Sequence, residues 1–285
     1  MSVVFKNGEF LERSQATIDI EDRGYQFGDG VYEVIRVYNG KMFTGKEHLQ
    51  RLVESAEKIG LHLEYTIEEM TSFLSQLIEK NKLTLGTIYL QVTRGVSPRN
   101  HLFPSSEVKS VFIAYTKDIG RPVESMEKGV KAILLEDIRW LRCDIKSLNL
   151  LGNLLAKQKA AEAGCFEAIQ HRGEVVTEGS LSNISIVVNG KVKTHPANNL
   201  ILNGISRQKM LQVCRDHDIA FEETTYTKEE LLQAEEVFLT GTTVEVTPIV
   251  EVEGKIIGTG TIGLVTKKLQ ELFKAEIEKE CGTIE

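Results

Sequence analysis

The stretch Asp144-Ile145-Lys146-Ser147-Leu148-Asn149 contains the lysine that is most informative about fold and function. Lys146 follows the apolar-edged run 138–145 and precedes an amphipathic helical pattern. We therefore expect its amine at the mouth of the fold and not on a solvated face. Because a lysine with a lowered pKa forms Schiff bases with carbonyl compounds, Lys146 is a candidate catalytic residue.

One helix and one hairpin further on, a second stretch supplies a candidate carboxylate. Its sequence is Val176-Thr177-Glu178-Gly179-Ser180-Leu181-Ser182-Asn183-Ile184. Glu178 is expected in a short Gly/Ser break between two strand-like runs, where its side chain can point into a cleft. An imine-forming amine and a distant acid together suggest pyridoxal phosphate, because that cofactor needs both an amine and an acidic partner for its ring nitrogen.

Length and composition indicate a globular protein of one large or two medium domains. The chain has 285 residues, of which 41% are hydrophobic and 26% charged. Its net charge of −7 argues against a nucleic-acid partner. The polar segment 117–123 contains a glycine and a proline, so we place a domain boundary there. The expected domains are an N-terminal α/β domain over 1–119 and a C-terminal domain over 120–285 that carries the cofactor lysine.

Several classes of protein are not expected from the sequence. No apolar run reaches the length that spans a membrane, and the N-terminus lacks the pattern of a signal peptide. The four cysteines are scattered, which predicts free thiols in a cytoplasmic protein. The six histidines include no H-E-x-x-H motif, so no metal site is expected. The cysteines are Cys143, Cys165, Cys214 and Cys281.

Local signals predict much of the secondary structure. Asn-Gly pairs at 7–8, 39–40 and 189–190 predict tight hairpin turns. The spacing of Thr66 to Glu69, and of Thr227 to Glu230, is typical of helix-capping boxes. Ser206 is a natural N-cap for the helix that follows it. Helices are predicted over 47–59, from 66 onward, and over 148–163, 207–217 and 262–279. Strands are predicted over 31–38, 87–93, 110–115, 130–135 and 237–239.

Three places could bind a phosphate group. The segment Gly204-Ile205-Ser206 precedes a helix, so free backbone N–H groups and the helix dipole can face an anion. The segment Gly241-Thr242-Thr243 follows a buried strand and offers hydroxyl and N–H donors. Arg51 flanks the apolar stripe of the helix predicted over 47–59 and could add a guanidinium fork. Each of these segments is also compatible with a purely structural role.

A long polar loop over 94–104 carries a pair of basic residues. Long loops in compact domains are often functional. Arg99 and His101 stand two residues apart in this loop, so both side chains can point the same way in an extended backbone. Together they could grip a carboxylate, although a solvated loop would show the same residues.

Taken together, these pieces resemble the fold-type IV pyridoxal-phosphate enzymes of the class IV aminotransferase family, and within it the D-amino acid aminotransferases. The matching pieces occur in the order of the family, with similar spacing, over nearly the whole chain. The resemblance implies an α/β fold of the α+β type, with a smaller N-terminal α/β domain and a larger C-terminal β-barrel-like domain with flanking helices. The pieces are Asp22-Arg23-Gly24, the run 27–33, the run 48–52, Arg99-Asn100-His101, the run 144–149, the run 177–183, Gly204-Ile205-Ser206-Arg207 and Thr240-Gly241-Thr242-Thr243.

The resemblance also implies roles for individual residues. Lys146 would hold pyridoxal 5′-phosphate covalently and later move a proton between the substrate and the cofactor. Glu178 would pair with the protonated ring nitrogen. The phosphate would be bound by Arg51, Ile205, Ser206 and Thr242, and the pocket would be lined by Ser180, Leu181, Ser182 and Leu202. Tyr32, Arg99 and His101 would hold the carboxylate of the substrate.

The implied reaction converts D-alanine and 2-oxoglutarate to pyruvate and D-glutamate by a ping-pong mechanism. In the family, the Arg-x-His loop distinguishes the D-specific members and reaches the active site of a partner subunit, so a homodimer is implied. The substrates would be small amino acids and 2-oxo acids, with neither nucleic acid nor membrane as a partner. Alternatives within the family are a branched-chain L-amino acid aminotransferase and an aminodeoxychorismate lyase. An alternative of another class is a non-catalytic α/β binding protein with a structural lysine.

Overall fold

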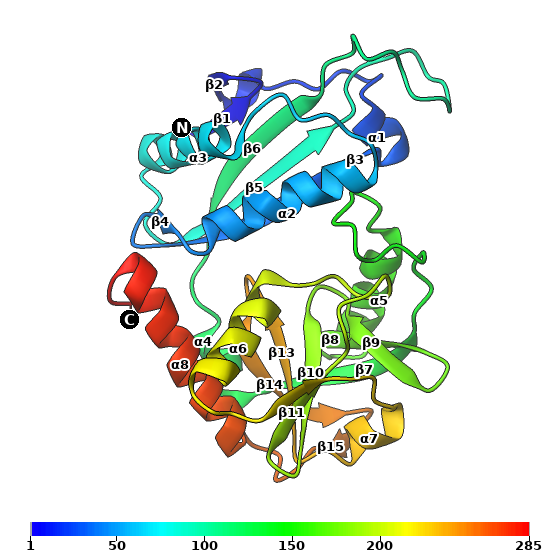
Figure 1. Cartoon of the computed structure of the whole chain (residues 1–285), viewed down its shortest axis with the longest axis vertical. Coiled ribbons are helices and arrows are strands. Elements are labelled where there is room, and N and C mark those ends of the chain that lie inside the picture. The colour runs from blue at the N-terminus through cyan, green and yellow to red at the C-terminus, as the bar shows by residue number, and fades with distance from the viewer. Residues whose placement is uncertain (1, 285) are drawn as a thin grey trace. The chain divides into compact units, whose positions relative to one another are not determined.

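The computed structural model describes residues 2–284, which fold into two compact units (Figure 1). The first unit contains the chain up to Gly120, the segment Ile145–Asn149 and the residues from Ile277 onward. The second unit contains Arg121–Asp144 and Leu150–Glu276. The sequence prediction placed Lys146 in the C-terminal domain, whereas its segment clusters with the first unit.

Backbone hydrogen bonds explain why the lysine segment belongs to the first unit. The Tyr32 N–H donates to the Lys146 carbonyl over 3.0 Å, and the Leu148 N–H donates to the Gly30 carbonyl over 3.0 Å. These bonds make a short antiparallel bridge between Ser147 and a strand of the first unit. Such long-range pairing leaves no local sequence signal.

An antiparallel sheet with strand order β2-β1-β6-β5-β3-β4 is the frame of the first unit. Its strands are β1 (Val3–Lys6), β2 (Glu9–Glu12), β3 (Gly30–Tyr38), β4 (Lys41–Met42), β5 (Gly86–Thr93) and β6 (Val111–Asp118). The predicted turns at Asn7-Gly8 and Asn39-Gly40 are confirmed, since all four residues have positive φ angles. Tight turns of this kind fix the register of the strands on either side.

Helices cover one face of this sheet, as Figure 1 shows for α2 and α3. The helical segments are η1 (Arg13–Gln15), α1 (Arg23–Phe27), α2 (Gly45–Lys58) and α3 (Ile67–Asn81). Alternate residues of β3, among them Val31 and Ile35, are buried in the same cluster as Leu52 and Leu74 from the helices. The predicted capping box of Thr66 and Glu69 is confirmed at the start of α3. Because side chains alternate along a strand, Tyr32 lies on the opposite face of β3.

The second unit is built on a mixed sheet with the order β12-β11-β10-β13-β14-β7-β8-β9, to which β15 adds beside β14. The strands are β7 (Val130–Glu136), β8 (Glu167–Arg172), β9 (Val175–Gly179), β10 (Asn183–Val188), β11 (Lys191–Thr194), β12 (Phe221–Glu223), β13 (Glu236–Gly241), β14 (Glu245–Val252) and β15 (Lys255–Ile256). The sheet curls. Between β9 and β10 the chain makes a tight turn, in which the Gly179 N–H donates to the Ser182 carbonyl over 2.7 Å. The mixed α/β class and the barrel-like second unit agree with the predicted fold.

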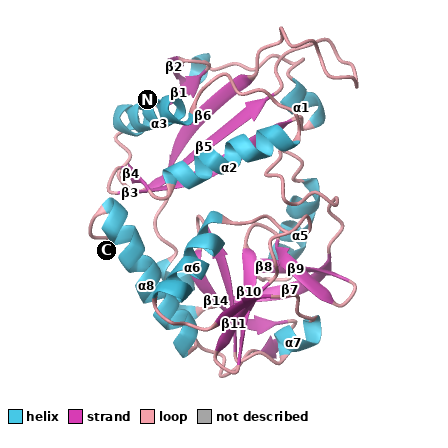
Figure 2. Cartoon of the chain, in the orientation of Figure 1, coloured by secondary structure: helices cyan, strands magenta, loops and turns pink. Residues whose placement is uncertain are grey.

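Helices flank the curled sheet (Figure 2). They are α4 (Val123–Lys128), α5 (Leu151–Glu162), α6 (Ile205–Asp216), α7 (Lys228–Leu232) and α8 (Leu264–Cys281). The capping box of Thr227 and Glu230 at α7 is confirmed. Among residues 2–284, no helix is long and apolar enough to cross a membrane.

Three local predictions differ from the structure. The helix predicted from Leu148 begins at Leu151, and Leu148 still belongs to the segment that pairs with β3, where its N–H donates to Gly30. Ser206 is not an N-cap: α6 begins at Ile205, two residues before the predicted start, and Gly204 is its N-cap without any side-chain cap. Glu178 lies within strand β9 and not in a break between strands.

Candidate functional site

Lys146 is fixed by its own backbone, and its amine lies against an aromatic ring. Its carbonyl accepts the Tyr32 N–H, and its own N–H donates to the Ser55 hydroxyl over 3.2 Å. The side chain is half-buried, with Nζ 4.3 Å from the centroid of the Tyr32 ring. The ring of Tyr32 stacks in turn on that of Tyr89, with centroids 5.7 Å apart. The fold therefore presents a held, partly shielded amine, as Schiff-base chemistry requires.

A buried cluster of charged side chains joins α2 to β3. Glu33 accepts hydrogen bonds from Arg51 Nε at 2.6 Å and Nη2 at 2.9 Å, and its other contact is His48 Nδ1 at 2.7 Å. Burial would raise the pKa of Glu33, but the neighbouring Arg51 and His48 outweigh it and hold that pKa well below its ordinary value. Burial lowers the pKa of His48. The sequence reasoning missed Glu33, which fixes the Arg51 guanidinium; phosphate binding by Arg51 stays a prediction.

The structure gathers Arg99 and His101 on one aromatic side chain. The guanidinium carbon of Arg99 lies 4.4 Å from the centroid of the Phe27 ring, and the His101 ring centroid lies 5.6 Å from it. Both side chains are exposed in the chain. The expected common orientation of these two residues is therefore present.

In the second unit, Glu178 is buried and surrounded by donors. It accepts hydrogen bonds from Arg139 Nη1, from Asn183 Nδ2 at 2.9 Å and from the Leu202 N–H at 3.0 Å. Burial raises the pKa of Glu178 to about 7, although Arg139 opposes that rise. Arg139 is held by Asp137, with Nη2 2.8 Å from Oδ2. Charge held by converging donors in a buried site is typical of an anchor for a cationic ligand group.

Arg139 is a residue that the sequence reasoning missed. Burial would lower its pKa, but the hydrogen bond to Asp137 and the charge of Glu178 raise it. Its only sequence signal is a charged residue within the apolar-edged run before Lys146. The pairing with Glu178 depends on the fold and could not be inferred from spacing.

The predicted pocket residues after Glu178 face in different directions. The hydroxyls of Ser180 and Ser182 both donate to the buried carboxylate of Glu167, and the Ser182 bond is 2.8 Å long. Leu181, between them, is exposed. Glu167 was not foreseen, because nothing in its local sequence distinguishes it from a surface glutamate. It orients the turn between β9 and β10.

The start of α6 fits an anionic group. No side chain caps this end, and Ile205 and Ser206 form its first turn. Thr240 pairs across the sheet with Asn183, and its buried hydroxyl has no hydrogen-bond partner among residues 2–284. Thr242 follows in the turn after β13. A buried hydroxyl without a partner and an uncapped helix start, together with the Glu178 anchor, are the donors and acceptors that pyridoxal phosphate needs.

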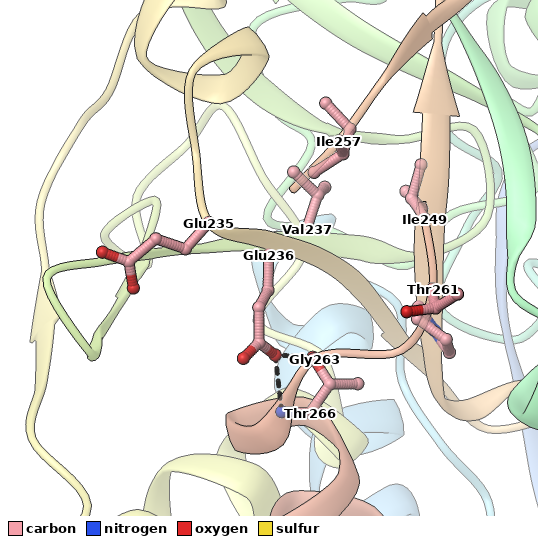
Figure 3. A pocket seen from close by; sticks show the side chains of 9 residues that line it. Glu235, Glu236, Val237, Ile249, Ile257, Thr261, Gly263 and Thr266 are labelled. Atoms are coloured by element: carbon pink, nitrogen blue, oxygen red, sulfur yellow. Dashed lines mark hydrogen bonds between the residues drawn. The ribbon is translucent and has the colours of Figure 1, made fainter. Parts of the chain in front are cut away.

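A small hollow elsewhere in the second unit has a structural explanation (Figure 3). Glu236 lines it and accepts hydrogen bonds from the Val265 N–H at 2.9 Å and the Thr266 N–H at 2.7 Å. Glu236 therefore caps the start of α8. No group of three His, Cys, Asp or Glu residues among those described could hold a metal ion.

Comparison with known proteins gives consistent results for the whole chain. The family model described as amino-transferase class IV matches residues 30–252. A D-alanine aminotransferase of Staphylococcus haemolyticus is 51% identical over 99% of this chain and 100% of its own length. The branched-chain amino acid aminotransferase of Escherichia coli has a TM-score of 0.90 at 27% identity, covering 94% of this chain and 92% of that one. A branched-chain amino acid aminotransferase of T.th., solved with pyridoxamine 5′-phosphate, has a TM-score of 0.91 at 25% identity, covering 98% and 94%.

Proposed function

The chain belongs to the class IV aminotransferase family, whose members use pyridoxal phosphate, and from this premise we propose that it transfers amino groups from D-amino acids to 2-oxo acids. The proposed reaction takes D-alanine and 2-oxoglutarate to pyruvate and D-glutamate. The observation that carries this proposal is the identity of about half of all residues, over the full length, with a D-alanine aminotransferase. A non-catalytic binding protein does not fit this relationship.

Lys146 is the proposed catalytic residue. Bound pyridoxal phosphate supplies an electron sink for the pair left on the substrate α-carbon when its proton departs. Lys146 would hold the cofactor covalently and, once freed, its amine would carry the proton that leaves the substrate α-carbon. A base positioned in this way contributes roughly 10²–10⁴-fold to the rate. The Tyr32 ring, 4.3 Å from Nζ, restricts where the released amine can go.

Glu178 is proposed to bind the cofactor ring nitrogen in its protonated form. The carboxylate is held by Arg139, Asn183 and the Leu202 N–H, so its direction is set before the cofactor arrives. A positive charge on the ring nitrogen would favour the ionised form of Glu178. Phosphate binding is proposed for Arg51, Ile205, Ser206 and Thr242, with Ser180, Leu181, Ser182 and Leu202 lining the pocket.

Handedness is proposed to come from the carboxylate grip formed by Tyr32, Arg99 and His101. The grip fixes the side on which the substrate carboxylate lies, and so decides which enantiomer presents its α-hydrogen to Lys146. We also propose a homodimer, because the family resemblance implies that the loop of Arg99 and His101 reaches the active site of a partner subunit. The four free cysteines are compatible with the proposed cytoplasmic location.

Donor specificity tests the proposal against its alternatives within the family. The enzyme, loaded with pyridoxal phosphate, is incubated with 2-oxoglutarate and either D-alanine or L-leucine, and the 2-oxo acid product is measured. We expect pyruvate from D-alanine and little product from L-leucine. Turnover of L-leucine without turnover of D-alanine would instead identify a branched-chain L-amino acid aminotransferase. Release of pyruvate from an aminodeoxychorismate substrate would favour the lyase.

A further inference from the structure

We propose that Phe27 and Arg23 are positioning residues that hold Arg99 and His101 ready for the substrate carboxylate, an inference that rests on the proposed function of that pair. Both belong to the segment Asp22–Gly30, whose Asp-Arg-Gly and Phe-Gly-Asp-Gly pieces were part of the sequence resemblance without any assigned role. All of these residues lie in the first unit.

Phe27 orders Arg99 without neutralising it. The Arg99 guanidinium carbon lies 4.4 Å from the Phe27 ring centroid, within the range of a cation–π contact. His101 contacts the same ring at 5.6 Å between centroids. No carboxylate among residues 2–284 pairs with Arg99 or His101. An acidic partner would have used up the charge and the N–H donors, whereas an aromatic face leaves the donors for a ligand.

Arg23 holds the backbone of the loop on both sides of His101. Its side chain is buried, and Nη1 donates to the Asn100 carbonyl at 2.7 Å and the Leu102 carbonyl at 3.3 Å. The guanidinium carbon of Arg23 lies 4.8 Å from the centroid of the Phe27 ring. Phe27 therefore contacts the side chains of Arg23, Arg99 and His101. Arg23 in turn fixes the backbone of the loop that carries Arg99 and His101.

Asp29 fastens this arrangement to the rest of the first unit. It accepts Arg23 Nε at 2.8 Å and Arg94 Nε at 2.8 Å. Arg94 also donates hydrogen bonds to the carbonyls of Ile59 and Gly60, each at 2.8 Å, just after the end of α2. Arg23 and Arg94 thus share the Asp29 carboxylate. Arg99, in contrast, contacts an aromatic ring, so its guanidinium can pair with a ligand carboxylate.

The first test is kinetic and uses Phe27→Leu, which keeps apolar bulk and removes the aromatic face. We expect KM for D-alanine and for 2-oxoglutarate to rise about tenfold, with kcat within about threefold of wild type. Phe27→Tyr should restore both KM values, since a ring face is present again. Tyr25→Leu is the matched control, because Tyr25 lies on the same short helix and is 78% exposed; its KM values should be unchanged. A general loss of structure would lower kcat through the active fraction and leave KM unchanged.

The second test does not depend on transamination. Trypsin cleaves after Arg99 only when the side chain leaves Phe27, so Phe27→Leu and Arg23→Gln should each raise the initial rate of cleavage at Arg99 severalfold. Unchanged KM values and cleavage rates in both variants would overturn the inference. Faster cleavage in a protein whose wild type does not transaminate D-amino acids would contradict the proposed function and support the positioning role. If Phe27→Leu does not fold, Arg23→Gln decides on the same two readouts.

Discussion

At the scale of single residues, Glu178 shows how burial and charge compete. Three donors point at its carboxylate, yet burial dominates and raises the pKa to about 7. An acid with a raised pKa in the folded state binds its proton more tightly there than in the unfolded chain. The free energy of unfolding of the cofactor-free protein therefore falls as the pH rises from about 4.5 to about 7. Bound cofactor, with a positive ring nitrogen, would oppose this loss.

Glu178→Gln should remove this part of the pH dependence. The contribution reaches at most about 3 kcal/mol, from the size of the pKa change. Glutamine also places an N–H₂ group among donors, which costs stability equally at every pH. Urea unfolding of both cofactor-free proteins at several pH values between 5 and 8 measures the difference. Parallel curves for wild type and variant would show that Glu178 does not titrate in this range.

At the scale of single elements, the N-terminus of α8 is capped by a residue of strand β13, which is distant in sequence. Glu236, the first residue of β13, accepts the N–H groups of Val265 and Thr266 and the hydroxyl of Thr266. A helix start carries unpaired N–H groups, and a carboxylate also complements its dipole. Glu236 therefore joins a strand to a helix through hydrogen bonds that no local capping motif predicts.

Glu236→Ala should lower the free energy of unfolding by about 1–2 kcal/mol, the usual cost of losing a helix cap. Glu271→Ala, an exposed change in the middle of the same helix, is the matched control and should be nearly neutral. Both are measured by urea unfolding at one pH. Equal losses in the two variants would contradict the capping role of Glu236.

Elements were predictable from sequence where their signals are local. The Asn-Gly turns and the two capping boxes each need only a few consecutive residues, and the structure contains them. The prediction of Ser206 as an N-cap was wrong because α6 begins two residues earlier than expected, with Gly204 in the capping position. Partners brought together from distant segments, such as Arg139 for Glu178 and Phe27 for Arg99, could not be inferred because their pairing exists only in the fold.

At the scale of the whole molecule, the chain leaves the second unit for five residues to place Lys146 in the first. Sequence resemblance identified the family correctly, and the cofactor role of Lys146 stays a prediction. It could not reveal that the segment pairs with β3, because the bridge joins residues far apart in the chain. All covalent cofactor chemistry is proposed for this single lysine.

Covalent labelling tests that central claim most directly. The enzyme loaded with pyridoxal phosphate is reduced with borohydride, which makes the bond between lysine and cofactor permanent, and is then digested with trypsin. We predict that the phosphopyridoxyl group appears on the peptide Cys143–Lys157, uncut at Lys146, and on no other peptide of the chain. Lys146→Ala treated in the same way should keep its fold, carry no label and lose transamination. Label on a different lysine, or activity near wild type in Lys146→Ala, would contradict the account.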